Sequence, residues 1–302
     1  MISIIGSGRV GASIAFLCVS NALDDVLLIN RTKDKAIGES LDIASAIPNT
    51  SKFSICGTDD YSKLTGSHIV IITASTGVYL KDRTENMDLQ VNMIKIIADK
   101  IKQYCPNTII LMISNPLDVL TYFFQKESGL DRFKVIGIAS SLDTSRFRYF
   151  ISEKFKISNS TISNALVLGE HGDSLVPIFS NVTVNGISLL SLMNDIDKDS
   201  MILDVRNYWK KLRIYKGRSQ FGIAKNAYDV INTIINSKEL LIPASVVLEG
   251  EYGENNLAMG VPVKINQHGI SEIQKININN FESTQLKNSS NKIRNDINSI
   301  QI

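Results

Sequence analysis

Cysteine, histidine and tryptophan are scarce in this sequence. The 302 residues include three cysteines, three histidines and one tryptophan. The cysteines are Cys18, Cys56 and Cys105; no two of them have the spacing of metal ligands, and their odd number argues against a disulfide framework. We therefore expect no metal site and a cytoplasmic protein that keeps its thiols reduced.

Charge of one sign and long apolar runs are also absent. The 32 basic and 30 acidic residues give a formal net charge of +2, so we expect no cationic surface for a nucleic acid. The chain has no stretch of about 18 uninterrupted apolar residues, and it does not open with a basic segment followed by a cleavable apolar one. These absences predict a protein that binds neither nucleic acid nor membrane.

The composition is that of a globular protein large enough for two domains. Hydrophobic residues make up 44% and charged residues 21% of the chain, which excludes disorder as its main state. In the first half, short apolar runs alternate with stretches of helical spacing. The runs are Ile2–Ile5, Val26–Ile29, 68–73, 108–113 and 134–138, and the helical stretches are Arg9–Ser20, 84–104 and 117–127. This alternation predicts a parallel sheet covered by helices on both faces.

The second half has a different rhythm, in which strands and helices are mixed. We expect a strand at 161–168, a strand, turn and strand at 176–187 around Asn185-Gly186, helices at 196–212 and 221–236, strands at Leu240–Glu249 and 257–265, and a C-terminal helix from about Asn280. The predicted fold class is therefore α/β, with a doubly wound parallel sheet in residues 1–141 and an α+β domain in residues 142–302.

A glycine-rich turn follows the first predicted strand. Its residues are Gly6, Ser7, Gly8, Arg9, Val10 and Gly11, which match the pattern G-x-G-x-x-G. Gly6 permits a tight turn, Gly8 leaves room for a pyrophosphate beside the backbone, and Gly11 allows the next helix to pack closely on the strand. The N-terminus of that helix offers free N–H groups to phosphates. Because the pattern lies between a strand and an amphipathic helix, it predicts a dinucleotide site rather than a plain turn.

The end of the second predicted strand carries no acidic residue. A unit that prefers NAD usually has Asp or Glu there, which binds the ribose hydroxyls. This chain has Asn30, which does not repel a 2′-phosphate, and Arg31, which can attract one. We predict that NADP is accepted and can be preferred over NAD; the alternative is that Arg31 is a solvated turn residue of an NAD site.

Of the three histidines, His171 lies in the setting that best suits catalysis. It follows a strand within Gly-Glu-His-Gly-Asp, where flanking glycines leave the ring open to a ligand. Asp143 and Arg146 share one face of a predicted helix. An acid bonded to a histidine fixes its tautomer, and an arginine can hold a carboxylate; the alternative is an ion pair between Asp143 and Arg146 alone. Asn115 ends another strand, where it could touch cofactor and substrate, and its bond to Pro116 could be cis.

Together these residues resemble the malate/lactate dehydrogenase family over nearly the whole chain. The matching segments are GSGRVG at 6–11, SNPLDV at 114–119, VIGI at 135–138, LDTSRFR at 142–148, GEHGD at 169–173, GEYG at 250–253 and GVPV at 260–263. Their shared order and spacing are more specific than any one motif. The resemblance implies a Rossmann domain and a catalytic domain, a homodimer or homotetramer, and hydride transfer between a nicotinamide ring and a small 2-hydroxy or 2-oxo acid.

The resemblance also implies a role for each matching residue. His171 is the general acid and base, and Asp143 is its partner. Arg146 binds the substrate carboxylate, while Asn115 orients the substrate and the nicotinamide. The other predicted cofactor contacts are Thr73, Ala74, Ser75, Asn92 and Ile113.

The segment that aligns with the mobile loop of this family departs from the family pattern. The loop usually carries two arginines, one for the far end of the substrate and one for the reacting carbonyl; their positions here are Leu80 and Asn86. We expect Arg83, between these positions, to take over one lost role. Arg218, in a stretch that usually has small residues, is a second candidate for a far carboxylate. The alternative for each is a solvent-facing cation.

Malate and oxaloacetate are the predicted substrates. An enzyme for lactate or another 2-oxo acid is the alternative, because Leu80 offers an apolar contact instead of a charge. A second alternative, from a different class, is a nucleotide-binding relative that has lost efficient turnover, since both loop arginines are missing. The retained His171, Asp143 and Arg146 favour the enzyme.

Overall fold

A nine-stranded sheet forms the centre of the computed structural model, which describes residues 1–77 and 86–300. Six strands from the first half of the chain pair in parallel in the order β6-β5-β4-β1-β2-β3. Their bounds are β1 Ile2–Ile5, β2 Val26–Ile29, β3 Ile55–Thr58, β4 Ile69–Ile72, β5 Ile109–Met112 and β6 Val135–Gly137. The order reverses between β1 and β4, so the predicted doubly wound sheet is confirmed.

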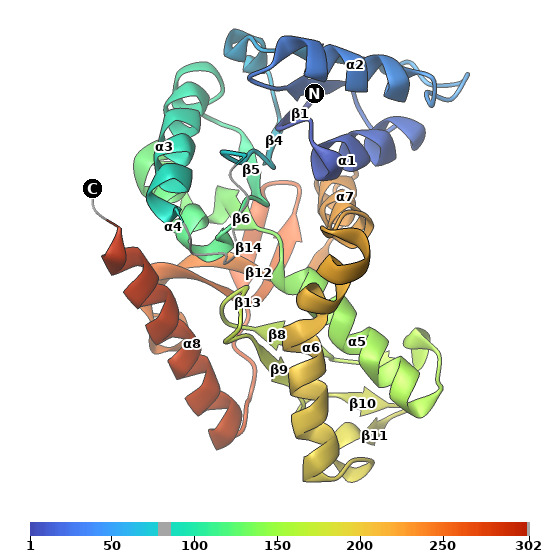
Figure 1. Ribbon diagram of the computed structural model, residues 1–302, viewed down its shortest axis with the longest axis vertical. Coiled ribbons are helices and arrows are strands. Elements are labelled where there is room, and N and C mark those ends of the chain that lie inside the picture. Colours follow the sequence, from blue (N-terminus) through green and yellow to red (C-terminus); the bar gives the residue numbers. More distant parts are fainter. Residues whose placement is uncertain (78–85, 301–302) are drawn as a thin grey trace.

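Helices cover both faces of this sheet, which explains why β1, β2, β4, β5 and β6 are buried and mostly apolar. In β1, Ile2 and Ile4 face one core cluster and Ile5 faces another. The first cluster includes residues of α1, α2 and α7, and the second includes residues of α3 and α4 (Figure 1). Their bounds are α1 Arg9–Ser20, α2 Lys33–Ala44, α3 Met87–Tyr104, α4 Leu117–Ser128 and α7 Phe221–Ile235.

Three antiparallel strands from the second half extend the same sheet. They are β12 Leu240–Glu249, β13 Asn255–Asn266 and β14 Gly269–Ile273. The junction is between β6 and β12, where Gly137 lies opposite Ser245. A Cβ on Gly137 would lie 2.7 Å from the Cβ of Ser245, so this close approach requires glycine. One sheet therefore runs through both predicted domains, and the division at 141 and 142 stays a prediction.

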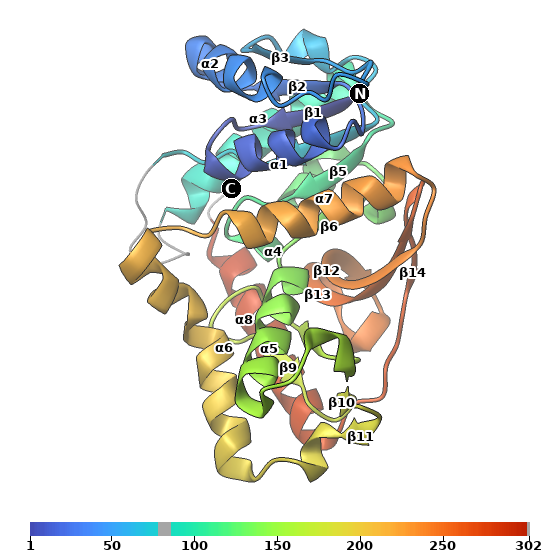
Figure 2. The ribbon, with the colours of Figure 1, turned by 90° about the vertical axis from the view of Figure 1, so that its right-hand side faces the viewer.

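The remaining elements lie below the sheet in Figures 1 and 2. The helices are α5 Ser140–Phe155, α6 Asp195–Lys216 and α8 Asn280–Ser299, and the strands are β7 Ile162–Ser163, β8 Leu166–Leu168, β9 Val176–Ile178, β10 Thr183–Val184 and β11 Ile187–Ser188. A third core cluster, which includes Phe147 and Phe179, is formed mainly by α5, α6, β7, β8 and β10, whereas α8 and β9 pack on the first cluster. Short 3₁₀ segments occur at Tyr61–Leu64, Arg132–Lys134, Asn159–Thr161, Leu189–Ser191 and Glu251–Gly253. None of the described helices is both long and apolar enough to cross a bilayer.

Two local predictions for the second half have different outcomes. The turn at Asn185-Gly186 is confirmed, because φ is +49° and +80° at these residues and they connect β10 to β11. A single strand at 161–168 is wrong. Asn164 has φ +56°, a left-handed conformation that separates β7 from β8.

Candidate active site

The glycine turn at 6–11 joins β1 to α1 at the carboxyl edge of the parallel strands. Gly6 has φ +110°, and a Cβ on it would lie 2.7 Å from the nitrogen of Ala74 and from Thr73 Oγ1. A Cβ on Gly11 would lie 1.9 Å from the carbonyl oxygen of Gly6. At Gly8, the N-cap of α1, a Cβ would meet no atom within 4 Å. The turn is closed toward the protein and open at the helix N-terminus, which fits a bound pyrophosphate.

Polar contacts tie this turn to the end of β2. Ser7 is fully buried, and its hydroxyl accepts a hydrogen bond from Asn30 Nδ2 at 2.9 Å. Arg31 is exposed, and its guanidinium lies 3.5 Å from the carbonyl oxygen of Thr76. Asn30 and Arg31 therefore lie beside the turn, where a dinucleotide would present its adenosine ribose.

A cavity of about 330 Å³ lies next to the turn, where the ends of β4 and β5 face α5, α6 and α7. Several of the residues that line it were expected from the sequence: Val10, Thr73, Ala74, Ser75, Ile113, Asn115, Arg146, His171 and Arg218. The others are Gln90, Ser114, Ile138, Ala139, Leu142, Trp209, Leu212, Arg213, Gly217, Ser219 and Ile223. The cavity therefore draws on both halves of the chain, and the peptide bond between Asn115 and Pro116 at its edge is cis.

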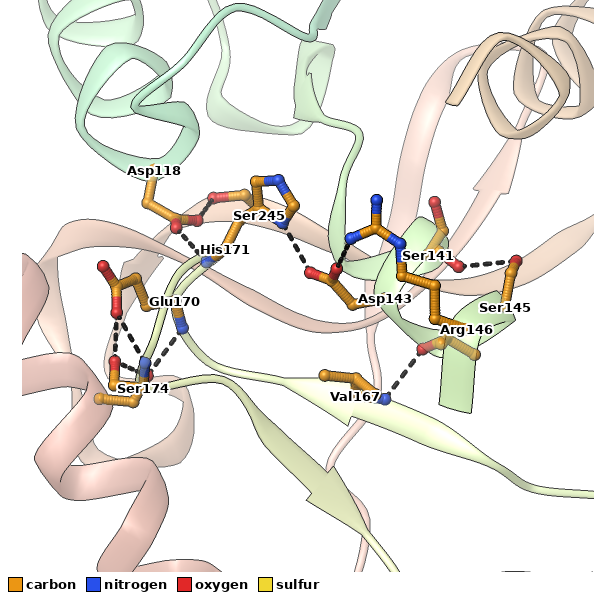
Figure 3. A network of polar contacts seen from close by, with 12 residues as sticks. Asp118, Ser141, Asp143, Ser145, Arg146, Val167, Glu170, His171, Ser174 and Ser245 are labelled. Atoms are coloured by element: carbon orange, nitrogen blue, oxygen red, sulfur yellow. Dashed lines mark hydrogen bonds and ion pairs between the residues drawn. The ribbon is translucent and has the colours of Figure 1, made fainter. Parts of the chain in front are cut away.

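His171, Asp143 and Arg146 meet at this cavity. Asp143 lies in the first turn of α5, and its two carboxylate oxygens contact different partners (Figure 3). Oδ2 lies 2.6 Å from Nδ1 of His171, and Oδ1 accepts a hydrogen bond from the guanidinium of Arg146 at 2.9 Å. All three side chains are buried. Asp143 thus orients the imidazole and the guanidinium together, so the ion pair and the histidine contact coexist.

Arg146 retains donors beyond its ion pair with Asp143. Its guanidinium lies 4.9 Å from the ring centre of Tyr208 on α6. Its Nε is buried and has no hydrogen-bond partner within the part of the chain that the structure describes. Because a guanidinium has five N–H donors, Arg146 can bind a carboxylate in the cavity while the ion pair stays intact.

The segment that carries His171 is anchored by two carboxylates that do not line the cavity. Asp118 accepts a hydrogen bond from the backbone N–H of His171 at 2.7 Å. Burial raises the pKa of the Asp118 carboxyl to about 7. Glu170 accepts hydrogen bonds from the backbone and hydroxyl of Ser174, and its own N–H donates to Ser289 on α8 at 2.7 Å. His171 is therefore on a segment fixed by neighbouring elements.

Trp209 and Arg213 line the cavity although the sequence did not single them out. They are four residues apart on α6 and share one face of that helix. Arg218 follows the end of α6 and lines the same cavity. A signal was present, because the single tryptophan of the chain and a basic residue one helical turn later precede the glycine that ends α6.

Not every residue expected from the sequence lies in the site. Asn92 is exposed on α3 and does not line the cavity, so its contact with the cofactor stays a prediction; Gln90, also on α3, does line the cavity. Arg9 is exposed at the start of α1. Leu80 and Arg83 lie outside the described residues. Asn86 is the N-cap of α3, with φ +58°.

Comparison with known protein families decides the family of this chain. Residues 1–137 match the lactate/malate dehydrogenase NAD binding domain, and residues 140–301 match the lactate/malate dehydrogenase alpha/beta C-terminal domain. The chain belongs to the lactate/malate dehydrogenase family. The resemblance noted from the sequence motifs is thereby confirmed.

Relatives of both substrate types are similar to this family member over nearly all of its length. A malate dehydrogenase of Chlorobium phaeobacteroides is 35% identical over 99% of this chain and 98% of its own length. L-lactate dehydrogenase 1 of Listeria innocua is 32% identical over 97% of this chain and 95% of its own length. A crystal structure of Cryptosporidium parvum lactate dehydrogenase, in complex with lactic acid and nicotinamide adenine dinucleotide, has a TM-score of 0.94 and 34% identity, and the match covers 98% of this chain and 96% of that one.

Family membership establishes the general reaction. This lactate/malate dehydrogenase family member is an NAD-dependent oxidoreductase that acts on a small 2-hydroxy acid. Its fold is a Rossmann-like parallel sheet with an α/β C-terminal domain. Identities to malate and lactate dehydrogenases are nearly equal, so the acid must be inferred from the residues of the site.

Proposed function

We propose that this protein is a malate dehydrogenase that interconverts malate and oxaloacetate. The observation that carries the proposal is the charge of the cavity wall. Arg146, Arg213 and Arg218 line the cavity, and no Asp or Glu lines it among residues 1–77 and 86–300. Such a wall favours a dianion over a monoanion, because each carboxylate can pair with its own guanidinium.

His171 transfers the proton in this proposal. Its Nδ1 lies 2.6 Å from Asp143, so an N–H at Nδ1 donates to the carboxylate and proton exchange with the substrate falls to Nε2. A protonated Nε2 gives its proton to the carbonyl oxygen in reduction, and a neutral Nε2 takes the hydroxyl proton in oxidation. Asp143 keeps the ring in the productive tautomer in both directions.

The arginines divide the two carboxylates of the substrate between them. Arg146, which lines the cavity, binds the carboxylate next to the reacting carbon. Arg213 and Arg218 approach from the end of α6 and bind the far carboxylate. Asn115, on the cofactor side of the cavity, orients the substrate. These contacts hold the acid in place for reaction.

The residues around the glycine turn fit a nicotinamide dinucleotide. The open N-terminus of α1 at Gly8 suits the pyrophosphate, and Thr73, Ala74 and Ile113 line the path from the turn to His171. When bound, the cofactor accepts or supplies the hydride.

NADP is accepted as well as NAD in this proposal. The end of β2 has no carboxylate to repel a 2′-phosphate, and Arg31 is exposed beside the turn. We expect the KM for NADPH to lie within about tenfold of that for NADH. Arg31→Ala should raise the KM for NADPH about tenfold and leave that for NADH within about twofold. A wild-type preference for NADH of more than about a hundredfold would contradict NADP use.

A panel of 2-oxo acids, followed by the absorbance of NADH and NADPH, tests the substrate. We expect kcat/KM for oxaloacetate to exceed that for pyruvate by about tenfold or more. Arg213→Gln and Arg218→Gln should each lower kcat/KM for oxaloacetate about tenfold and leave that for pyruvate within about twofold. Lys211→Gln, which removes an exposed charge of α6 outside the cavity, is the matched control.

The other outcomes of this panel identify the alternatives. Pyruvate as the better substrate would support a lactate dehydrogenase, which the apolar Leu80 favours. Cofactor binding without oxidation by any acid would support a nucleotide-binding relative that has lost turnover.

The protein assembles as a homodimer or homotetramer in this proposal. The helices α2, α1 and α7 lie one below another on the face shown in Figure 2. Large apolar side chains are exposed on these helices and at the end of α6; we call this set the apolar helix face. It consists of Phe16, Leu41, Ile214, Tyr215 and Phe221. Large apolar side chains that are exposed in a single chain are candidates for subunit contacts.

A further inference from the structure

A buried aspartate in the first turn of α4 has no part in the chemistry described above. Asp118 belongs to the SNPLDV segment and lies three residues after Asn115. It is 3% exposed and does not line the cavity. A buried carboxylate is costly unless its oxygens are hydrogen-bonded, so its contacts indicate what it does.

Both oxygens of Asp118 are bound, and each contact reaches another element. Oδ2 accepts the backbone N–H of His171 at 2.7 Å, and Oδ1 accepts the hydroxyl of Ser245 on β12 at 2.6 Å (Figure 3). Ser245 is fully buried and lies opposite Gly137 at the junction of β6 and β12. Asp118 therefore connects α4, the segment after β8 and the strand that joins the two halves of the sheet.

We propose that Asp118 is a positioning residue that sets the place of His171 relative to Asn115 by holding the backbone N–H of His171. Asp143 fixes the imidazole ring through Nδ1, whereas Asp118 fixes the main chain that carries the ring. Asn115 lies three residues before Asp118, just ahead of α4, so the hydrogen bond of Asp118 ties the main chain of His171 to the segment that carries the substrate-orienting residue. This inference rests on the proposed role of His171 in proton transfer.

The chemistry of the contact provides two variants with opposite expectations. In Asp118→Asn, the amide oxygen can still accept the His171 N–H, while the amide nitrogen donates to Ser245, whose hydroxyl can reverse its role. In Asp118→Ala, the buried N–H and hydroxyl lose their partner. Positioning therefore depends on the hydrogen bond and survives loss of the charge.

A remote carboxylate with similar contacts serves as the control. Glu282 in α8 is 1% exposed, accepts the backbone N–H groups of Phe179 and Ser180 at 2.9 Å each, and accepts the hydroxyl of Ser180 at 2.5 Å. It does not line the cavity. Glu282→Ala removes a buried carboxylate that holds main-chain N–H groups without touching His171, so it reports the structural cost alone.

Steady-state kinetics with the best acid from the panel are the first measurement. We expect Asp118→Ala to lower kcat about tenfold or more, with the Kd of NADH within about twofold. Asp118→Asn should keep kcat within about threefold, and Ser245→Ala should fall between the two. Glu282→Ala should keep kcat within about twofold. Equal losses in Asp118→Asn and Asp118→Ala, or an unchanged kcat in Asp118→Ala, would overturn the proposal.

Nuclear magnetic resonance of protein labelled with ¹⁵N-histidine tests the contact without turnover. The chain has three histidines, so three backbone amide signals are expected, and His68→Gln and His268→Gln assign them. The His171 amide proton should lie downfield in the wild type, move upfield in Asp118→Ala and move little in Asp118→Asn. An unmoved signal in Asp118→Ala would overturn the proposal. Failure of the wild type to reduce any acid would instead contradict the proposed function, and the amide signals would still decide whether Asp118 holds His171.

Discussion

His171 is the residue on which the proposed reaction depends most. Replacing it by Asn removes the proton donor but leaves the glycine turn and most of the cavity intact. We expect His171→Asn to lower kcat by about 10²- to 10⁴-fold while the Kd of NADH, measured by fluorescence, changes by no more than about twofold. His268→Asn is the control, since His268 is exposed in the turn between β13 and β14. Undiminished turnover in His171→Asn would exclude general acid-base catalysis by this residue.

Asp118 should also make the stability of the protein depend on pH. Its pKa is raised from an ordinary 3.8 to about 7, mainly by burial, so the folded protein holds a proton that the unfolded chain releases above about pH 4. The stability that this bound proton contributes is fully present below pH 4 and is lost as the pH rises through 7. Asp118→Asn removes this pH dependence. Between pH 5 and pH 8, the free energy of unfolding of the variant, measured with urea, should rise by about 2 kcal/mol relative to that of the wild type. A difference in the free energy of unfolding between variant and wild type that stays constant from pH 5 to pH 8 would contradict this prediction.

At the scale of single residues, the sequence motifs predicted the catalytic side chains but not the buried residue that holds them in place. His171, Asp143 and Arg146 could be predicted because their neighbours in sequence, glycines or one helix face, suggest a function. Asp118 could not be connected to its partners, because His171 and Ser245 lie 53 and 127 residues away along the chain. Contacts over such separations depend on how the sheet brings β8 and β12 to α4, which spacing alone does not reveal.

Two glycines of the turn between β1 and α1 have different functions: Gly11 allows close packing, and Gly8 leaves room for the cofactor. Gly11→Ala places a Cβ 1.9 Å from the carbonyl of Gly6 and should cost about 3 kcal/mol of stability in thermal or urea unfolding. Gly8→Ala meets no atom within 4 Å and has φ −84°, so its stability should stay within about 0.5 kcal/mol. The added methyl group should nevertheless raise the Kd of NADH about tenfold or more, because it occupies the approach to the helix N-terminus. Matching effects of both substitutions on stability would contradict this division.

Strongly patterned elements were predictable, and elements at the edge of the sheet were not. The buried strands β1, β2 and β4 form apolar runs because helices cover both of their faces. In contrast, β3 is a partly exposed edge strand that contains Gly57, so it has no apolar run. The buried face of α2 consists of Ala36, Ser40 and Ile43, which gives little contrast with its polar side. Both elements escaped prediction for these reasons.

The apolar helix face predicts the assembly state of the whole molecule. In size-exclusion chromatography with light scattering, the wild type should have two or four times the chain mass of 33.4 kDa. The double substitution Tyr215→Glu and Phe221→Glu should shift the protein toward the monomer, because it places charges on side chains that are 81% and 68% exposed in the single chain. Ile187→Glu, on the distant β10–β11 hairpin, should leave the mass unchanged. A monomeric wild type would contradict the proposed oligomer.

The junction of β6 with β12 limits how this enzyme can be rebuilt. Severing the chain between these strands would leave main-chain N–H and C=O groups of β6 without their neighbour. A C-terminal half taken from a relative would therefore have to reproduce the close approach of Ser245 to Gly137 before it could bring a new substrate choice. The side chains that α6 presents to the cavity can be altered without disturbing that junction.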